Sequence, residues 1–200
     1  MSEIKVDKIS PSSGTALAVG DSGDTITIPS GATITNSGTA NGFGGGKILQ
    51  MVSFPFTDVF TMSSTTPADT GITVNITPSA TSSKIYVVAH VTWHGGASEK
   101  GGNIFLYRGG SPTAYIADAN GTGIRATHSV RFIHGYHGNE QMQSTFSYLD
   151  SPNSTSQQTY AIYVSVESGH NFWINRDADV GTTVPRGRSV SSITCMEYGA

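Results

Sequence analysis

Six histidines are the first candidates for chemistry in this chain, because imidazole is a common ligand of transition metals. His90 and His94 lie four residues apart in an alternating segment and so share one face of a strand. At about 3.3 Å per residue they are roughly 13 Å apart, too far to bind one ion together. His134 and His137 fall on opposite faces of a regular strand, although Gly135 would permit a bulge. A symmetric site would need one histidine from each of three chains; packing or loop polarity is the simpler interpretation, and we expect neither metal nor other cofactor.

Acidic residues are too dispersed to suggest hydrolysis of a polysaccharide. That reaction needs two carboxyl groups across the scissile bond, and no spacing pairs the candidates, which are Glu99, Asp118, Glu140, Asp150 and Glu167. The Gly-x-Ser-x-Gly sequence of a nucleophile elbow is absent. Residues 175–181 alternate oxygen-bearing side chains as a calcium loop does, but the glycine falls one position late and no closing glutamate follows. We therefore expect a protein that is not an enzyme.

Aromatic residues beside polar ones, close to the ends of predicted strands, are better candidates for binding. Flat apolar rings next to hydrogen-bonding groups suit sugar rings and protein surfaces. The candidate receptor-binding residues are Trp93, His94, Tyr115, Tyr136, His137, Trp173 and Arg176. The alternative is that both tryptophans pack in the core or between protomers.

Composition excludes several classes of partner. The net charge is −3 and the 11 Lys and Arg residues are scattered, so we expect no binding of nucleic acid. Arg186 and Arg188 are expected in a solvated loop. The single Cys195 excludes an intrachain disulfide framework and is expected to be a small buried residue. The first residues have no signal-peptide pattern and no apolar run approaches about 18 residues, so we expect no membrane insertion.

From residue 47 onward, alternating polar and apolar residues predict a series of short β-strands. The strand candidates are 47–54, 56–60, 71–78, 84–94, 103–108, 115–117, 129–136, 143–149, 159–167, 172–174 and 189–198. They recur about every ten to fifteen residues with turn signals between them, and no long helical period interrupts them. The pattern predicts an all-β fold, an antiparallel β-sandwich of two sheets, most simply a jelly roll.

The segment 84–94 is the most informative of these candidates. One face carries Ile85, Val87, Ala89, Val91 and Trp93. The other face carries Tyr86, Val88, His90, Thr92 and His94. Since the second face is also apolar near its start, we expect a central strand with that end covered by a neighbouring protomer.

Residues 20–46 predict a Gly/Thr-rich β stalk shared by three chains, ending in a glycine hinge at 44–46. Thr and Ile alternate over 25–28 and 33–35, with a turn at Pro29-Ser30-Gly31 between them. Ordering so many residues costs more than their few large apolar side chains return, so one chain cannot form this ribbon alone. A flexible linker, or an edge strand of the following domain, is the alternative. Residues 1–19 are expected to be an N-terminal attachment arm, and residues 47–200 a head domain.

Several segments resemble the tail-fibre and related virion proteins of phages, particularly those of marine bacteria and cyanobacteria. In the second part of the chain these are 106–111, 148–152 followed by Thr159 and Tyr160, 174–176 and 191–198; near the start they are 2–11 and 20–43. The order and spacing of these segments carry the resemblance. It implies a homotrimeric fibre whose C-terminal jelly roll, similar to tumour-necrosis-factor-like heads, is displayed outward.

Together these observations predict a structural and adhesive virion protein. The expected partners are two further copies of the chain, other virion proteins through residues 1–19, and a host surface glycan or outer-membrane protein. The expected location is the tail or capsid surface of the virion, after assembly in the host cytoplasm. A capsid decoration or capsid-attached fibre protein is the first alternative, and a polysaccharide-cleaving tailspike is the second.

Overall fold

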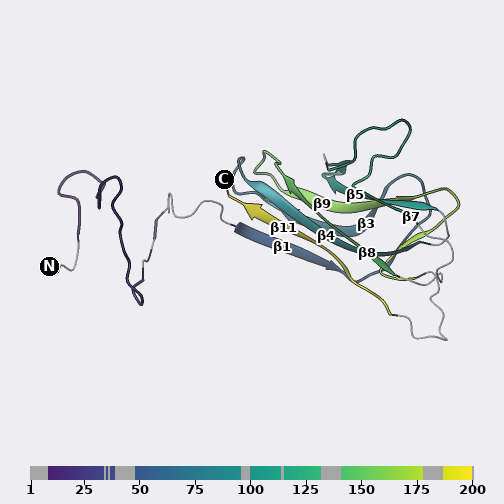
Figure 1. Ribbon diagram of the computed structural model, residues 1–200, viewed down its shortest axis with the longest axis horizontal. Coiled ribbons are helices and arrows are strands. Elements are labelled where there is room, and N and C mark those ends of the chain that lie inside the picture. Colours follow the sequence, from purple (N-terminus) through teal and green to yellow (C-terminus); the bar gives the residue numbers. More distant parts are fainter. Residues whose placement is uncertain are drawn as a thin grey trace. The chain divides into compact units, whose positions relative to one another are not determined.

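The computed structural model describes residues 9–33, 35, 37–38, 48–95, 100–113, 115–131, 141–177 and 187–199. The chain divides into two compact units, Met1–Phe43 and Gly44–Ala200. The described part of the second unit contains strands and no helix, and its two antiparallel sheets enclose one core (Figure 1). The predicted all-β class and antiparallel pairing are therefore confirmed. No described helix has the length and apolarity needed to cross a bilayer.

In the described part of the chain, eleven strands make up the two sheets. Sheet A has β1 (Ile48–Phe56), β11 (Ser191–Tyr198), β4 (Lys84–Gly95) and β8 (Met142–Asp150) in that order, and the short β10 (Phe172–Ile174) and β2 (Phe60–Met62) extend from the end of β4. Sheet B has β3 (Ala68–Ile76), β9 (Gln158–Val166) and β5 (Gly101–Arg108), with β6 (Ser111–Pro112) and β7 (His128–Arg131) both paired to β5. Both sheets are antiparallel throughout.

The eight longer strands pair in a nested way. Along the chain, the first of them pairs with the last (β1 with β11), the second with the seventh (β3 with β9), the third with the sixth (β4 with β8) and the fourth with the fifth (β5 with β7). The outermost pair, β1 with β11, therefore joins the two ends of this unit, whereas β5 and β7 are close in sequence.

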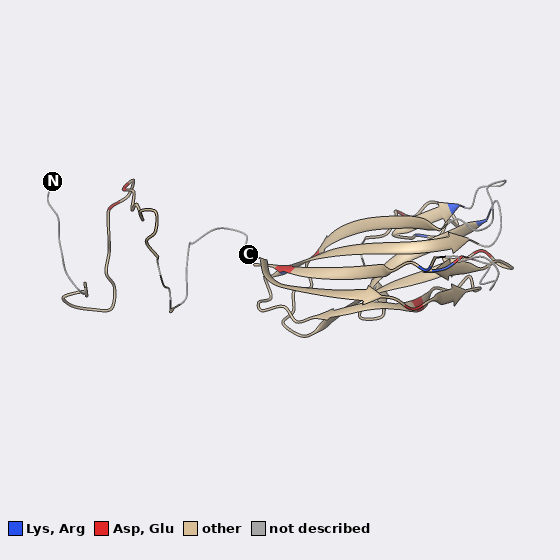
Figure 2. Cartoon of the chain, turned by 90° about the horizontal axis from the view of Figure 1, so that it is seen from below, with Lys and Arg blue, Asp and Glu red and all other residues tan. Residues whose placement is uncertain are grey.

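β4 is the central strand of sheet A, as its sequence pattern predicts. It pairs with β11 and β10 on one side and with β8 on the other. Its odd-numbered side chains from Ile85 to Trp93 are all buried and belong to the core. Its even-numbered side chain Tyr86 is 38% exposed on the outer face of the sheet. Figure 2 shows that most of both sheets lacks charged residues, and that the visible basic positions lie toward the end away from the C-terminus.

The predicted strand at 115–117 is wrong. Residues 115–117 form a loop that is tied to the returning chain: the Ala117 N–H donates to the Ala126 carbonyl at 3.1 Å, and the Thr127 hydroxyl donates to the Tyr115 carbonyl at 2.7 Å. Three residues of suitable type are too few to indicate a strand. Here residues 126–127 of the same chain form the hydrogen bonds that a neighbouring strand would otherwise provide. The predicted strand at 129–136 is observed up to Arg131, and its remainder lies outside the described residues.

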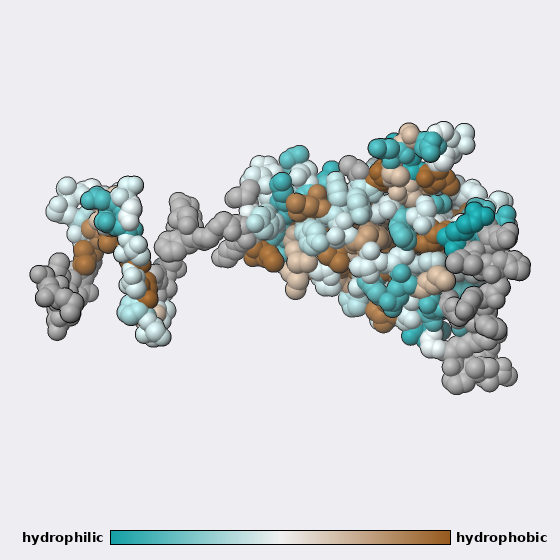
Figure 3. All heavy atoms as spheres, viewed as in Figure 1, coloured by the Kyte–Doolittle hydropathy of each residue, from teal (hydrophilic) through white to brown (hydrophobic). Residues whose placement is uncertain are grey.

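The described residues of the first unit contain turns and no strand. The predicted turn at Pro29-Ser30-Gly31 is present, with the Ala32 N–H donating to the Pro29 carbonyl at 3.1 Å and Gly31 at a φ of 86°. The large apolar side chains of this unit are exposed, namely Ile9, Leu17, Val19, Ile26 and Ile28. In the single chain these side chains lie in water, and Figure 3 shows hydrophobic atoms at the surface of this unit. The stalk shared by three chains stays a prediction.

Glu197 is a fully buried carboxylate near the end of β11. It accepts hydrogen bonds from the Ser79 N–H at 2.7 Å, the Ser79 hydroxyl at 2.6 Å and the Gln50 amide at 2.6 Å. Burial by itself would raise its pKa, but these hydrogen bonds outweigh burial and lower the pKa from 4.5 to about 2. The charged carboxylate is therefore part of the folded structure.

This lowered pKa makes the stability of the sandwich sensitive to acid. Because the folded-state pKa lies below the unfolded value, the contribution of Glu197 is complete above about pH 4.5 and is lost as the pH falls toward 2. We expect the wild type to lose roughly 2 kcal/mol more of its free energy of unfolding over this range than Glu197→Gln does. Urea denaturation from pH 7 to pH 2.5 measures the difference. Parallel pH curves for the two proteins would contradict the assignment.

Candidate functional site

Three of the predicted binding residues come together where β4 ends. Trp173 of β10 lies directly opposite His94 of β4 in the strand register. Their rings stack with centroids 5.4 Å apart and planes 25° apart. The Arg176 guanidinium carbon lies 6.0 Å from the centre of the Trp173 ring, within the range of a cation–π contact. We call these three residues the His94–Trp173–Arg176 cluster.

The cluster is partly open to solvent. His94 is buried, with 5% of its surface exposed, whereas Trp173 and Arg176 are half-buried. The accessible groups are therefore an indole ring and a guanidinium. The ring can stack on a sugar or an apolar side chain, and the guanidinium can donate hydrogen bonds to hydroxyl or carboxylate oxygens.

Asn175 stabilises the turn that follows β10 by hydrogen bonds to two other segments. It ends β10 with a φ of 60°, a left-handed conformation that Asn tolerates better than most residues. Its side-chain amide donates to the carbonyls of Phe56 at 2.7 Å and Asp58 at 2.9 Å, and its side-chain oxygen accepts from the Ser191 hydroxyl at 2.7 Å. The turn at Asn175 is what brings Arg176 back over Trp173. The rest of the residues 175–181 that were compared with a calcium loop, from residue 178 on, lies outside the described residues.

Trp93 faces the core and is not part of a surface. It is 5% exposed, its ring stacks on Phe172 with centroids 5.5 Å apart, and its indole N–H donates to the Ser144 hydroxyl at 2.8 Å. The alternation along β4 already assigned Trp93 to the apolar face. The structure thus supports the packing interpretation of Trp93 and removes it from the candidate contact residues.

Tyr115 lies in a different part of the sandwich. Its ring stacks on Tyr148 of β8 with centroids 5.1 Å apart and planes 12° apart. Tyr148 is opposite Val87 in the register, seven residues before His94, which corresponds to about 23 Å along β4. Tyr115 therefore cannot share a small site with Trp173. Tyr136 and His137 lie outside the described residues.

The histidines of β4 do not form a metal site within the described chain. His90 makes a 2.9 Å hydrogen bond with the Thr145 hydroxyl, and His94 stacks on Trp173. Across the described ranges, no three His, Cys, Asp or Glu residues gather closely enough to hold an ion. Cys195 is fully buried, and burial raises the pKa of its thiol to about 12, so the thiol is protonated at neutral pH.

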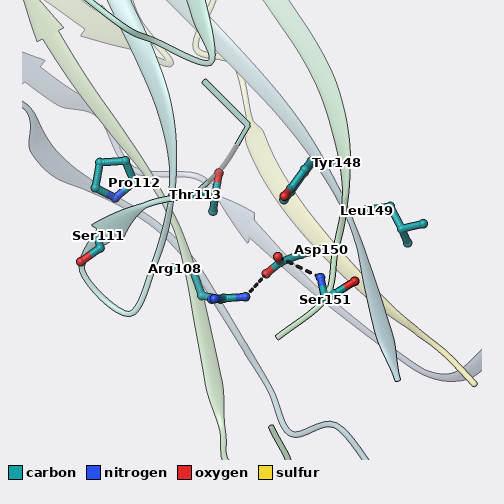
Figure 4. A pocket seen from close by; sticks show the side chains of 8 residues that line it. All are labelled: Arg108, Ser111, Pro112, Thr113, Tyr148, Leu149, Asp150 and Ser151. Carbon is teal, nitrogen blue, oxygen red and sulfur yellow. Dashed lines mark hydrogen bonds and ion pairs between the residues drawn. The ribbon is translucent and has the colours of Figure 1, made fainter. Parts of the chain in front are cut away.

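A second feature, which the sequence did not reveal, is a hollow of about 380 Å³ at the opposite end of the sandwich (Figure 4). Its lining residues are Arg108, Ser111, Pro112, Thr113, Tyr148, Leu149, Asp150 and Ser151. Asp150 pairs in register with Ile85, close to the start of β4. No spacing in the sequence brings Arg108 and Asp150 together, because they belong to different sheets.

Three hydrogen bonds fix the Asp150 carboxylate in this hollow. Arg108 of β5 donates at 2.5 Å, the Tyr160 hydroxyl of β9 donates at 2.7 Å and the Ser151 N–H donates at 2.9 Å. Burial, followed by the hydrogen bond to Asp150, raises the pKa of Tyr160, so Tyr160 keeps its proton and acts as donor. Because Asp150 belongs to sheet A and both side-chain donors to sheet B, the group joins the two sheets.

No protein-family model matches this chain, and no curated protein matches it. Fold and site alone therefore define its class: an all-β protein with two antiparallel sheets, a half-buried aromatic and basic cluster at one end and a polar hollow at the other.

Proposed function

We propose that this chain is a trimeric fibre protein of a phage virion, whose β-sandwich head binds the host cell surface. The sequence resemblance supports the assignment to a virion, and the observation that carries the trimer is a row of apolar side chains across the outer face of sheet A. In the strand register Met51 is opposite Met196, Met196 opposite Tyr86, and Tyr86 opposite Leu149. Met51, Tyr86 and Leu149 are 65%, 38% and 48% exposed. We call these four residues the outer apolar row.

The outer apolar row is the surface that we assign to contact between protomers. It crosses four adjacent strands, so its side chains form one continuous strip. Farther along the same face of β8 and β4 the residues are polar, such as Thr145 and His90. A strip of exposed apolar side chains bordered by polar ones is typical of a protein interface. The exposed isoleucines of the first unit need other chains for the same reason.

The sandwich itself is proposed to be a jelly roll, the fold that the sequence resemblance implies. The nested pairing of the eight longer strands supports this, since a jelly roll is a long antiparallel hairpin wrapped into two sheets.

We assign contact with the host surface to the His94–Trp173–Arg176 cluster. Its accessible indole and guanidinium suit a glycan or a protein loop. Binding by one such cluster is weak, and three heads per fibre, with several fibres per particle, would raise the overall affinity by about two to four orders of magnitude. The mechanism is adhesion without covalent chemistry.

Light scattering of the purified full chain tests the trimer. We expect a mass of three times 20.9 kDa. Tyr86→Glu combined with Leu149→Glu places two charges in the outer apolar row and is expected to shift the mass toward a monomer, because burying an unpaired charge is costly. Gln143→Glu, on the same face of β8 but beyond the row, is the matched control and should remain a trimer. A monomeric wild type would contradict the proposal.

Binding to cells of the host tests the adhesive surface. We expect Arg176→Ala to weaken binding about tenfold or more, as loss of an interface arginine often does. Arg125→Ala is the matched control, because both arginines donate their Nε–H to a backbone carbonyl at 2.8 or 2.9 Å, and Arg125 lies in another loop. Equal binding by the two variants would remove the cluster from the contact surface.

Labelling intact virions with an antibody against residues 47–200 tests the role in the particle. A signal on fibres supports the proposal, whereas a uniform signal over the shell indicates a capsid decoration protein. Release of oligosaccharides from host polysaccharide by the purified chain would indicate a tailspike and overturn the adhesive mechanism.

A further inference from the structure

We propose that the hollow beside Arg108 and Asp150 is a binding site for a neutral sugar residue. Its volume of about 380 Å³ falls in the range of small-molecule sites, roughly 300 to 1,000 Å³. It opens at the edge of the sandwich between β6 of sheet B and β8 of sheet A. The site is distinct from the His94–Trp173–Arg176 cluster, which lies near the other end of β4.

The hollow presents donors and acceptors side by side. Within the described chain, Arg108 uses one Nη1–H for Asp150, and a guanidinium has five N–H groups in all. Among the described residues, only the Ser151 N–H donates to the other carboxylate oxygen of Asp150, although that oxygen has two lone pairs. Hydroxyl groups of Ser111, Thr113 and Ser151 also line the wall. Such alternation of donors and acceptors matches the hydroxyl groups of a sugar.

The charge of the site favours a neutral ligand. The Arg108 guanidinium and the Asp150 carboxylate are in direct contact and cancel each other. An anionic ligand would approach the carboxylate, and a cationic ligand would approach the guanidinium, so each meets one repulsive partner. A polyhydroxyl ligand can donate to Asp150 and accept from Arg108 without such repulsion.

The lining groups are held in place before any ligand binds. Asp150 is bonded to two other strands, through Arg108 of β5 and Tyr160 of β9, and to its neighbour Ser151, and the Tyr148 ring is stacked on Tyr115. Prior ordering of side chains reduces the entropy cost of binding. Figure 4 shows the Leu149 side chain pointing away from Arg108 and Asp150. Tyr148 and Asp150 therefore face the hollow from one side of β8, whereas Leu149 belongs both to the rim of the hollow and to the outer apolar row.

Saturation-transfer NMR on the full chain tests the proposal, with glucose, galactose and mannose as neutral probes and glucuronate and glucosamine as charged ones. We expect transfer to at least one neutral hexose, with a dissociation constant of about 1 to 10 mM. Ser111→Trp, which fills the hollow from an exposed position, should abolish the transfer. Ser156→Trp adds the same ring at an exposed serine elsewhere and should leave it unchanged.

Two further variants keep the result interpretable. Arg108→Lys retains the positive charge beside Asp150 but loses the planar fork, and we expect it to weaken hexose binding about fivefold or more. Trp173→Ala, in the other cluster, should bind hexoses as the wild type does. Transfer that survives when Ser111→Trp is combined with Trp173→Ala, transfer to glucuronate alone, or no transfer to any probe at about 50 mM would each overturn the proposal. Loss of host binding in Arg176→Ala does not bear on it, so the two proposals fail separately.

Discussion

Replacing Asn175 with alanine is expected to lower the free energy of unfolding of the sandwich by roughly 3 to 5 kcal/mol. The substitution removes a fully buried amide that bonds the carbonyls of Phe56 and Asp58 and the hydroxyl of Ser191. A buried polar group left without its partner costs about 1 to 3 kcal/mol. Alanine also disfavours the φ of 60° at this position, by about 1 to 2 kcal/mol.

Two variants separate these causes in urea denaturation. Glycine adopts a φ of 60° without steric cost, so the loss of unfolding free energy in Asn175→Gly measures the removal of the amide alone. Asn153→Ala is the matched control, because Asn153 has a φ of 51° but is exposed, so only the conformational cost remains. We expect it to cost about 1 kcal/mol. If Asn153→Ala and Asn175→Ala cost the same, the hydrogen bonds of Asn175 do not stabilise the fold as inferred.

Gly102→Ala is expected to cost roughly 2 to 3 kcal/mol through overpacking of the core. A Cβ atom at position 102 would lie 2.6 Å from Cδ2 and 2.7 Å from Cε2 of Phe172, closer than such atoms approach in proteins. Phe172 cannot yield easily, since it is fully buried and stacks on Trp93. Any displacement of Phe172 also moves its neighbour Trp173, so host binding is expected to fall with stability.

The near-ultraviolet circular dichroism of Trp93 and the urea midpoint measure this effect. Gly187→Ala is the control, because no atom lies within 4 Å of its added Cβ and its φ is not positive. Phe172→Leu, introduced together with Gly102→Ala, should recover part of the loss by vacating the space that the Cβ needs. A Gly102→Ala protein as stable as Gly187→Ala would show that the packing around Phe172 is looser than the structure indicates.

The shape of the His94–Trp173–Arg176 cluster depends on Gly102 and Asn175. Gly102 allows Phe172 to lie flat on Trp93, and Asn175 turns the chain after Ile174. Trp173 lies between these two anchors, with its ring on the outer face beside His94. A half-buried ring is thus fixed by buried neighbours on both sides, which limits the entropy lost when a ligand binds.

Residue alternation was sufficient to predict most strands, because the pleat of a strand is a local property. The segments 84–94 and 172–174 are strands, and 84–94 has the predicted faces, with Tyr86 exposed on the outer one. The short segment 115–117 is a loop, because its backbone groups are satisfied by Ala126 and Thr127. The same alternation assigned Trp93 to the core face, and that assignment was more reliable than the aromatic character of the residue.

The sequence by itself determined the strand pattern, the all-β class and the turn at Pro29-Ser30-Gly31. Only the tertiary structure decided which distant residues meet: Arg108 with Asp150, Trp173 with His94, and Asn175 with Phe56 and Ser191. The physical reason is that strand register depends on pairing between segments far apart in the chain, and a shift of one residue reverses every side chain between core and surface. Local alternation specifies two faces for each strand, and neighbouring strands determine what each face contacts.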